Sequence, residues 1–159
     1  MSTNMLLQTL KSFVEQSVRD TGAGERPVTV HVGWLPGAER FPPAKPDEPA
    51  ELLPEGLFPF VLLRALEGAD GNEEGSVKVR LHFGTSSTDP FGYADVLNLI
   101  EKVRQAVLKK EIIGGMFELQ RPLKWKLANS QAYPQWTAEM VTEWNMPSPV
   151  REDLIYDNL

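Results

Sequence analysis

The chain has 159 residues, 42% of them hydrophobic and 24% charged, which is the balance of one globular domain and not of a disordered protein. Its net charge is −6 and its basic residues are scattered among acidic ones, which argues against sequence-specific nucleic-acid binding because phosphate contacts need a basic patch. The absence of cysteine excludes disulfides, thiol nucleophiles and thiolate metal sites. No apolar run reaches the ~20 residues of a membrane span, and the first residues lack the basic region of a signal peptide, so we expect synthesis in the cytoplasm.

The first third of the chain predicts a helix, a strand and a long loop. Residues 5–19 carry apolar side chains at the spacing of a one-sided helix, which residues 21–24 (TGAG) would end. Residues 27–35 alternate valines with polar residues, as a strand does. Residues 36–59 contain seven of the 13 prolines and follow neither period, which predicts a proline-rich loop. A loop of this length in a compact domain usually has a function.

The middle of the chain predicts a β-hairpin and a second helix. Residues 58–68 form a continuous apolar run suited to a strand covered on both faces, and residues 76–86 alternate strictly. The acidic turn at 68–75 would join them. Asp89 is the expected N-cap of a helix that ends near Lys110, before the glycine pair at 114–115.

Two further strands are expected at residues 116–129 and 136–147, with an extended C-terminal tail at 147–159. Antiparallel pairing would bring lysines of the first strand opposite glutamates of the second. The predicted fold class is α+β: a mostly antiparallel sheet with two amphipathic helices on one face, in the order α-β-β-β-α-β-β. We expect residues 1–159 to form a single domain.

No stretch of the sequence carries a catalytic or cofactor motif. The GxxxxGK[ST], GxSxG and HExxH patterns are absent. His31 and His82 fall on the polar side of two predicted strands, where adjacent strands would permit a metal site or a general base; the simpler interpretation is half-exposed sheet positions. The acidic turn starts like a calcium loop, but its twelfth position is Leu81, so a solvated turn is favoured. We therefore predict no enzyme activity, no catalytic residue, no metal and no cofactor.

The tryptophans concentrate in the last third of the chain. We expect most of the three tryptophans of this region, Trp125, Trp136 and Trp144, to lie in the core. Trp34, beside the proline-rich loop, and Tyr133 are harder to bury. Exposed aromatic residues near such loops are common in protein–protein contacts.

Three features between residues 57 and 152 resemble small tail-terminator (tail-completion) proteins of long-tailed bacteriophages and prophages. One is the hairpin PFVLLRALEG…VKVRLHFGT with the Ser/Thr–Asp–Pro turn after it. The second is the Asp89–Gly92–Tyr93 start of an amphipathic helix that ends in a basic segment. The third is the strand pair LKWKL and WTAEMVTEWNMP. The proline-rich insertion at 36–56 has no counterpart in this resemblance.

The resemblance implies a structural protein of the virion tail, made in the bacterial host cytoplasm. It would form a homo-oligomeric ring, typically a hexamer, that caps the tail tube and meets the head connector, without a membrane or a sequence-specific nucleic-acid partner. Acidic subunits around a lumen would repel passing DNA. Six residues are candidates for partner contacts: Trp34, Arg40, Phe41, Arg104, Lys109 and Lys110. The last three would equally suit a solvated helix face.

Two other functions fit the same sequence. One is a head–tail connector or minor tail protein of the same virion. The other is a small-ligand binding module or cofactor-free enzyme that uses a cavity between the helices and the sheet. The placement of polar residues separates them, because an enzyme gathers such residues inside a pocket, whereas an assembly protein presents an apolar patch.

Overall fold

The structure is a computed structural model that describes residues 2–19, 26–45 and 47–149. Its element order is α1 (Thr3–Val18), β1 (Thr29–Val32), the 3₁₀ helix η1 (Glu55–Leu57), β2 (Phe60–Asp70), β3 (Glu74–Ser86), α2 (Tyr93–Lys110), β4 (Ile112–Ile113), β5 (Phe117–Leu127) and β6 (Gln135–Pro147). The predicted α+β class and the order α-β-β-β-α-β-β are confirmed, with the two-residue strand β4 as an addition. Neither described helix is long and apolar enough to cross a membrane.

The six strands form one sheet in the order β1-β2-β3-β6-β5-β4. Only β1 and β2 run parallel, and the hairpin β2–β3 is antiparallel as predicted. Strand β6 lies between β3 and β5, so the two halves of the chain join along β3–β6, from Glu74↔Pro147 to Ser86↔Gln135. Glu139 lies opposite Lys126 of β5, which is the expected lysine–glutamate arrangement.

The main core lies between one face of the sheet and both helices. Helix α1 contributes Leu6, Leu10, Val14 and Val18 to it, at the one-sided spacing that the sequence shows. Helix α2 contributes Val96, Leu99, Ile100, Val103 and Val107. Both helices therefore cover the same face, as predicted.

The opposite face of the sheet has a smaller core, which the proline-rich loop covers. We call residues 36–59 the arm. Buried Phe60 and Leu62 of β2 pack with Leu35 and Phe58, and the arm adds Phe41 and Leu53. Strand β2 is thus buried on both faces over Phe60–Leu63 only, because its remaining residues extend beyond the arm.

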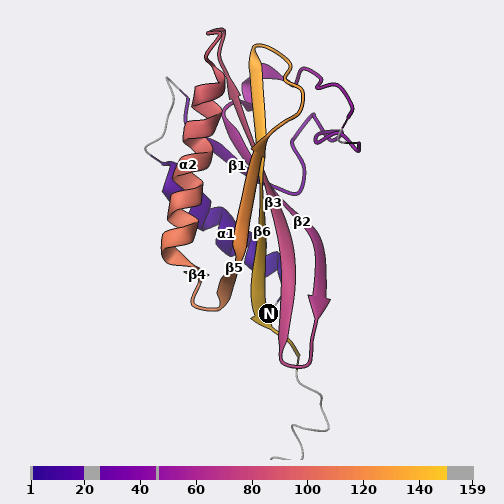
Figure 1. Cartoon of the computed structure of the whole chain (residues 1–159), viewed down its shortest axis with the longest axis vertical. Coiled ribbons are helices and arrows are strands. Elements are labelled where there is room, and N and C mark those ends of the chain that lie inside the picture. Colours follow the sequence, from indigo (N-terminus) through magenta and orange to yellow (C-terminus); the bar gives the residue numbers. More distant parts are fainter. Residues whose placement is uncertain (1, 20–25, 46, 150–159) are drawn as a thin grey trace, which may run out of the picture.

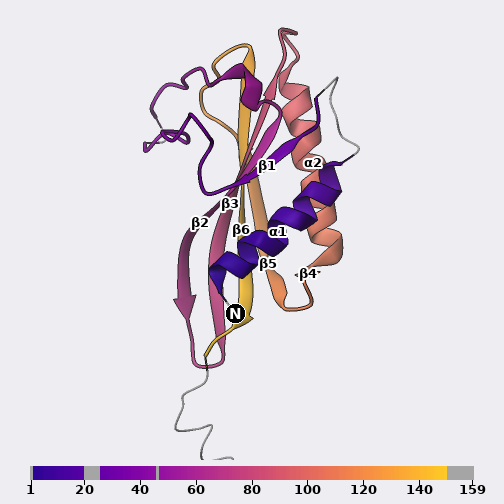
Figure 2. The same cartoon turned by 180° about the vertical axis from the view of Figure 1, so that it is seen from behind.

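Figures 1 and 2 show an elongated molecule with different features at its two ends. The arm and the connection between β5 and β6 lie at one end, together with the start of α2. The turn between β2 and β3 lies at the other end. We call these the arm end and the hairpin end.

The two edge strands, β1 and β4, are short, and the strands next to them, β2 and β5, are irregular. Among the described residues β1 accompanies β2 only as far as Leu63, and the ladder between β2 and β3 is shifted by a bulge between Ala65 and Glu67. The ladder between β5 and β6 is shifted between Gln120 and Lys124, around Pro122.

Helix α2 departs from the prediction at its start. It begins at Tyr93 with Gly92 as its N-cap, and not at Asp89. The Asp89 carboxylate accepts a hydrogen bond from the Phe91 N–H (2.8 Å), and the Gly92 N–H bonds to the Asp89 carbonyl. Asp89 therefore closes a turn before the helix, as aspartates do when they bond to the backbone two residues on.

The predicted ends of α2 and β6 are confirmed. Helix α2 ends at Lys110, and Glu111, whose φ is 60°, is its C-cap; the glycines at 114–115 form the turn between β4 and β5 and do not end the helix. Strand β6 ends at Pro147, and Ser148 after it is buried. The turn at 21–24 and the rest of the tail lie outside the described residues.

Candidate functional site

The three candidates near the arm, Trp34, Arg40 and Phe41, lie in different environments. Trp34 is exposed, and the Arg64 guanidinium lies 4.1 Å from its ring centroid, in a cation–π contact. Arg40 is exposed. Phe41 is half-buried and faces the sheet, edge-on to Phe60 and to His82. A partner could therefore reach Trp34 and Arg40 directly, whereas Phe41 supports the arm.

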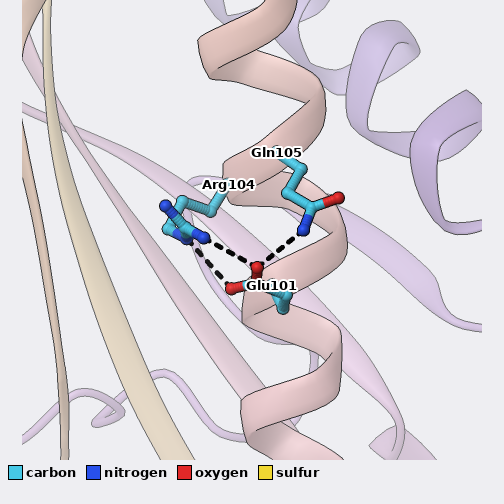
Figure 3. Close-up of polar contacts among 3 residues, drawn as sticks. All are labelled: Glu101, Arg104 and Gln105. Atoms are coloured by element: carbon cyan, nitrogen blue, oxygen red, sulfur yellow. Dashed lines mark hydrogen bonds and ion pairs between the residues drawn. The ribbon is translucent and has the colours of Figure 1, made fainter.

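The three helix candidates lie on α2, away from the arm. Arg104 is held by its own helix: its Nη2 and Nε donate to the two carboxylate oxygens of Glu101, which also accepts from Gln105 (Figure 3). This pairing lowers the pKa of Glu101 and raises that of Arg104. Lys109 and Lys110 border a shallow hollow between α1 and α2. The structure does not bring this group together with the arm-side candidates.

The arm is anchored by Gln135, the first residue of β6, and by Ser130 in the connection between β5 and β6. Gln135 is buried; its Oε1 accepts from the Leu53 N–H at 2.8 Å, and its Nε2 donates to the Leu53 carbonyl at 2.7 Å. The Ala50 N–H donates to the Ser130 hydroxyl at 2.8 Å. The arm is therefore a fixed layer along these residues.

A pocket of about 230 Å³ lies between the arm and the sheet. Its walls include Phe41, Pro42 and Leu53 of the arm, and its floor is the face of the sheet opposite the helices. Four floor residues carry its polar chemistry: Arg80 and His82 of β3, Glu139 of β6 and Lys126 of β5. This pocket lies on the other face of the sheet from the one that the ligand-binding alternative assumed.

Two cations of the floor share one carboxylate. Arg80 Nε lies 3.0 Å from one oxygen of Glu139, and Lys126 Nζ lies 3.3 Å from the other. The Arg80 Nε–H does not point along that contact, so it is an ion pair and not an aligned hydrogen bond. The cross-strand register explains the grouping, because His82, Glu139 and Lys126 are direct neighbours in one row of the sheet.

His82 is buried in this floor, which corrects the prediction of a half-exposed position. Its side chain is only 5% exposed, and its Nε2 has no hydrogen-bond partner within the described part of the chain. Burial and the charges of Arg80 and Arg64 lower the pKa of His82 to about 3. His82 is therefore a neutral imidazole at pH 7.

The two histidines do not form a site together. Leu62 of β2 lies between them in the sheet, paired with His31 on one side and with His82 on the other. Among residues 2–19, 26–45 and 47–149, no group of three or more potential ligands is placed to hold a metal ion.

An aromatic patch occupies the arm end beside the pocket. We define it as Phe91, Tyr93 and Tyr133, which are 70%, 41% and 57% exposed. The rings of Tyr93 and Tyr133 stand edge-on to Trp136, at 6.3 and 6.1 Å between centroids. The Tyr133 hydroxyl also donates to the Thr88 carbonyl. The patch is thus a surface with two fixed aromatic rings.

The tryptophans of the last third differ in burial. Trp144 is fully buried and Trp136 is half-buried, whereas Trp125 is exposed. Sequence reasoning singled out Tyr133 but missed Gln135 and the role of His82. The alternating pattern of β3 gave no signal for His82, because it does not reveal that the arm folds over the polar side of that strand.

The chain matches no protein-family model and no curated protein.

Proposed function

We propose that this chain is an assembly protein of a long-tailed bacteriophage or prophage, of the tail-terminator type, which caps the tail tube as a ring and contributes to head–tail joining. The resemblance over residues 57–152 supports this role, and its three features correspond to the hairpin β2–β3, helix α2 and the strand pair β5–β6. The α+β fold is compatible with it.

The aromatic patch is the observation that carries the proposal. Exposed aromatic side chains gathered in one place mark contact surfaces, because burying a ring against a partner removes a large apolar area from water. Here Tyr93 and Tyr133 are oriented by Trp136 before any partner binds. Such a preordered surface loses little conformational entropy on association. It suits a protein that binds other subunits.

Sedimentation velocity and native mass spectrometry test this role, with the chain alone and with the tail-tube protein encoded in the same gene cluster. We expect a closed ring, alone or on the tube protein. The double variant Phe91→Ser, Tyr133→Ser should weaken that association roughly tenfold or more, since aromatic residues dominate interface energetics. The matched control is Leu52→Ser, which removes an exposed apolar side chain from the arm.

Two results would contradict the proposal. One is a chain that stays monomeric at high concentration and does not bind the tube protein. The other is equal association of the patch variant and the wild type, which would show that the aromatic patch is not the contact surface of the ring.

A further inference from the structure

The pocket beneath the arm contains polar groups whose bonding capacity is unused. Arg80 Nε lies 3.0 Å from Glu139 without an aligned hydrogen bond, and among the described residues the two terminal nitrogens of Arg80 have no hydrogen-bond acceptor. Lys126 contacts the same carboxylate. Two positive charges facing one negative charge leave a surplus positive charge on the floor.

His82 adds a second, independent observation at the same floor. Its Nε2 is buried without a partner, although buried polar atoms are nearly always hydrogen-bonded in folded proteins. Because the imidazole is neutral, it can donate or accept a hydrogen bond without adding charge. A group that bonds to this nitrogen would satisfy it.

The size and walls of the pocket restrict what fits. A volume of about 230 Å³ is below the roughly 300–1,000 Å³ of cofactor and drug-sized sites, so it suits one or two side chains. Phe41, Pro42 and Leu53 provide an apolar wall next to the charged floor. Lys45, Glu48 and Glu51 line the arm side, so the surplus of positive charge is confined to the floor at Arg80 and Lys126, and a carboxylate is favoured only there.

We propose that this pocket binds a single acidic side chain, next to an apolar one, on an extended segment of a partner protein. The carboxylate accepts hydrogen bonds from the terminal nitrogens of Arg80 and lies near Lys126, while His82 donates its Nε2–H. The apolar neighbour packs on Phe41 and Pro42. This inference goes beyond the assembly role and does not depend on it.

A titration followed by ¹H–¹⁵N NMR tests the proposal on the whole chain. The probe is acetyl-Leu-Glu-amide, and the matched control is acetyl-Leu-Gln-amide, which has the same shape without the charge. We expect saturable shifts at Arg80, His82, Lys126 and Gln135 with the glutamate probe. The glutamine control should bind roughly tenfold more weakly, as loss of a charge-assisted hydrogen bond requires.

Variants separate the pocket from the surrounding charge. Arg80→Gln should reduce the affinity for the glutamate probe roughly tenfold. Arg80→Lys keeps the charge but not the planar guanidinium, so its affinity should lie between those of Arg80→Gln and the wild type. Lys78→Gln is the control, because Lys78 is an exposed cation on the same strand that pairs with Glu67 outside the pocket. The dispersion of each spectrum reports whether the variant is folded.

Three outcomes would overturn the inference. Equal binding of the two probes would show that the carboxylate is not recognised. Unchanged binding by both Arg80 variants would show that the floor of the pocket is not the binding site. Concentration-dependent shifts of the same residues without probe would assign the pocket to a second copy of the chain instead of a partner protein.

Discussion

The side-chain amide of Gln135 pairs with the backbone of Leu53 through two hydrogen bonds, as a neighbouring strand would. Both groups of the Leu53 backbone are satisfied by this one side chain. The contact joins residues 82 positions apart and fixes the arm to the first residue of β6.

Replacing Gln135 should therefore loosen the arm. We expect Gln135→Ala to lower the free energy of unfolding by about 1 to 2 kcal/mol, because the partly buried Leu53 groups lose their partners. Urea unfolding measures this loss, and hydrogen exchange at the Leu53 amide should accelerate. Gln105→Ala is the control, since Gln105 is exposed on α2 and bonds only to Glu101. Unchanged exchange at Leu53 would show that the arm is held elsewhere.

His82 should make stability depend on pH. The pKa of about 3 in the folded chain lies below the ordinary 6.5, so the unfolded chain binds the proton first as pH falls. The contribution of neutral His82 to the free energy of unfolding is fully present above pH 6.5 and is lost as the pH falls from 6.5 to about 3. At pH 5 the loss is about 2 kcal/mol.

Urea unfolding at pH 7 and pH 5 measures this effect. The difference between the two pH values should be smaller in His82→Gln than in the wild type, whereas His31→Gln should retain the dependence that His82 causes. The same pH dependence in the His82 variant and the wild type would contradict the assignment.

Gly84 should not tolerate a side chain. It lies opposite Phe60 in the β2–β3 ladder, and a Cβ at this position would overlap the Phe60 ring. That ring also contacts Phe41 and Phe58 edge-on, so moving it would disturb the packing of both. We expect Gly84→Ala to lower the free energy of unfolding by about 1 to 3 kcal/mol, measured by thermal or chemical denaturation. Adding Phe60→Leu should recover part of the cost, and strictly additive losses would disprove the overlap.

Thr142 links β3 and Trp144 in the main core. Its hydroxyl donates to the Val79 carbonyl and accepts from the Trp144 indole N–H, both at 2.8 Å. Thr142→Val should destabilise the protein by about 1 to 3 kcal/mol, since it leaves a buried N–H without an acceptor. Thr142→Ser keeps the hydroxyl and should lose less in the same unfolding assay. Equal losses in the two variants would assign the effect to packing.

The regular elements could be predicted because each has a local signal. The apolar spacing of α1 and α2 and the alternation of β3 and β6 reflect burial of one face, which a sequence records directly. The start of α2 was misplaced because Asp89 signals a cap and a turn equally well. The two-residue strand β4 is too short to show a period.

The site was less predictable because it depends on contacts distant in sequence. Arg80, Glu139 and Lys126 meet only because β6 lies between β3 and β5, and local patterns do not determine that order. His82 is buried by the arm, whose prolines predict a loop but not the face on which it packs. Trp34 and Tyr133 were expected to be hard to bury, and both are exposed.

The irregularities of β2 and β5, next to the two short edge strands, have a consequence at high protein concentration. A straight, unpaired strand edge is a template on which further chains add without limit, and this leads to aggregation. Here a bulge interrupts β2 beyond β1, and another, containing a proline without an N–H to donate, interrupts β5. Open-ended growth through backbone pairing is therefore disfavoured on both sides, so crowded copies should remain dispersed until specific side chains select their neighbours.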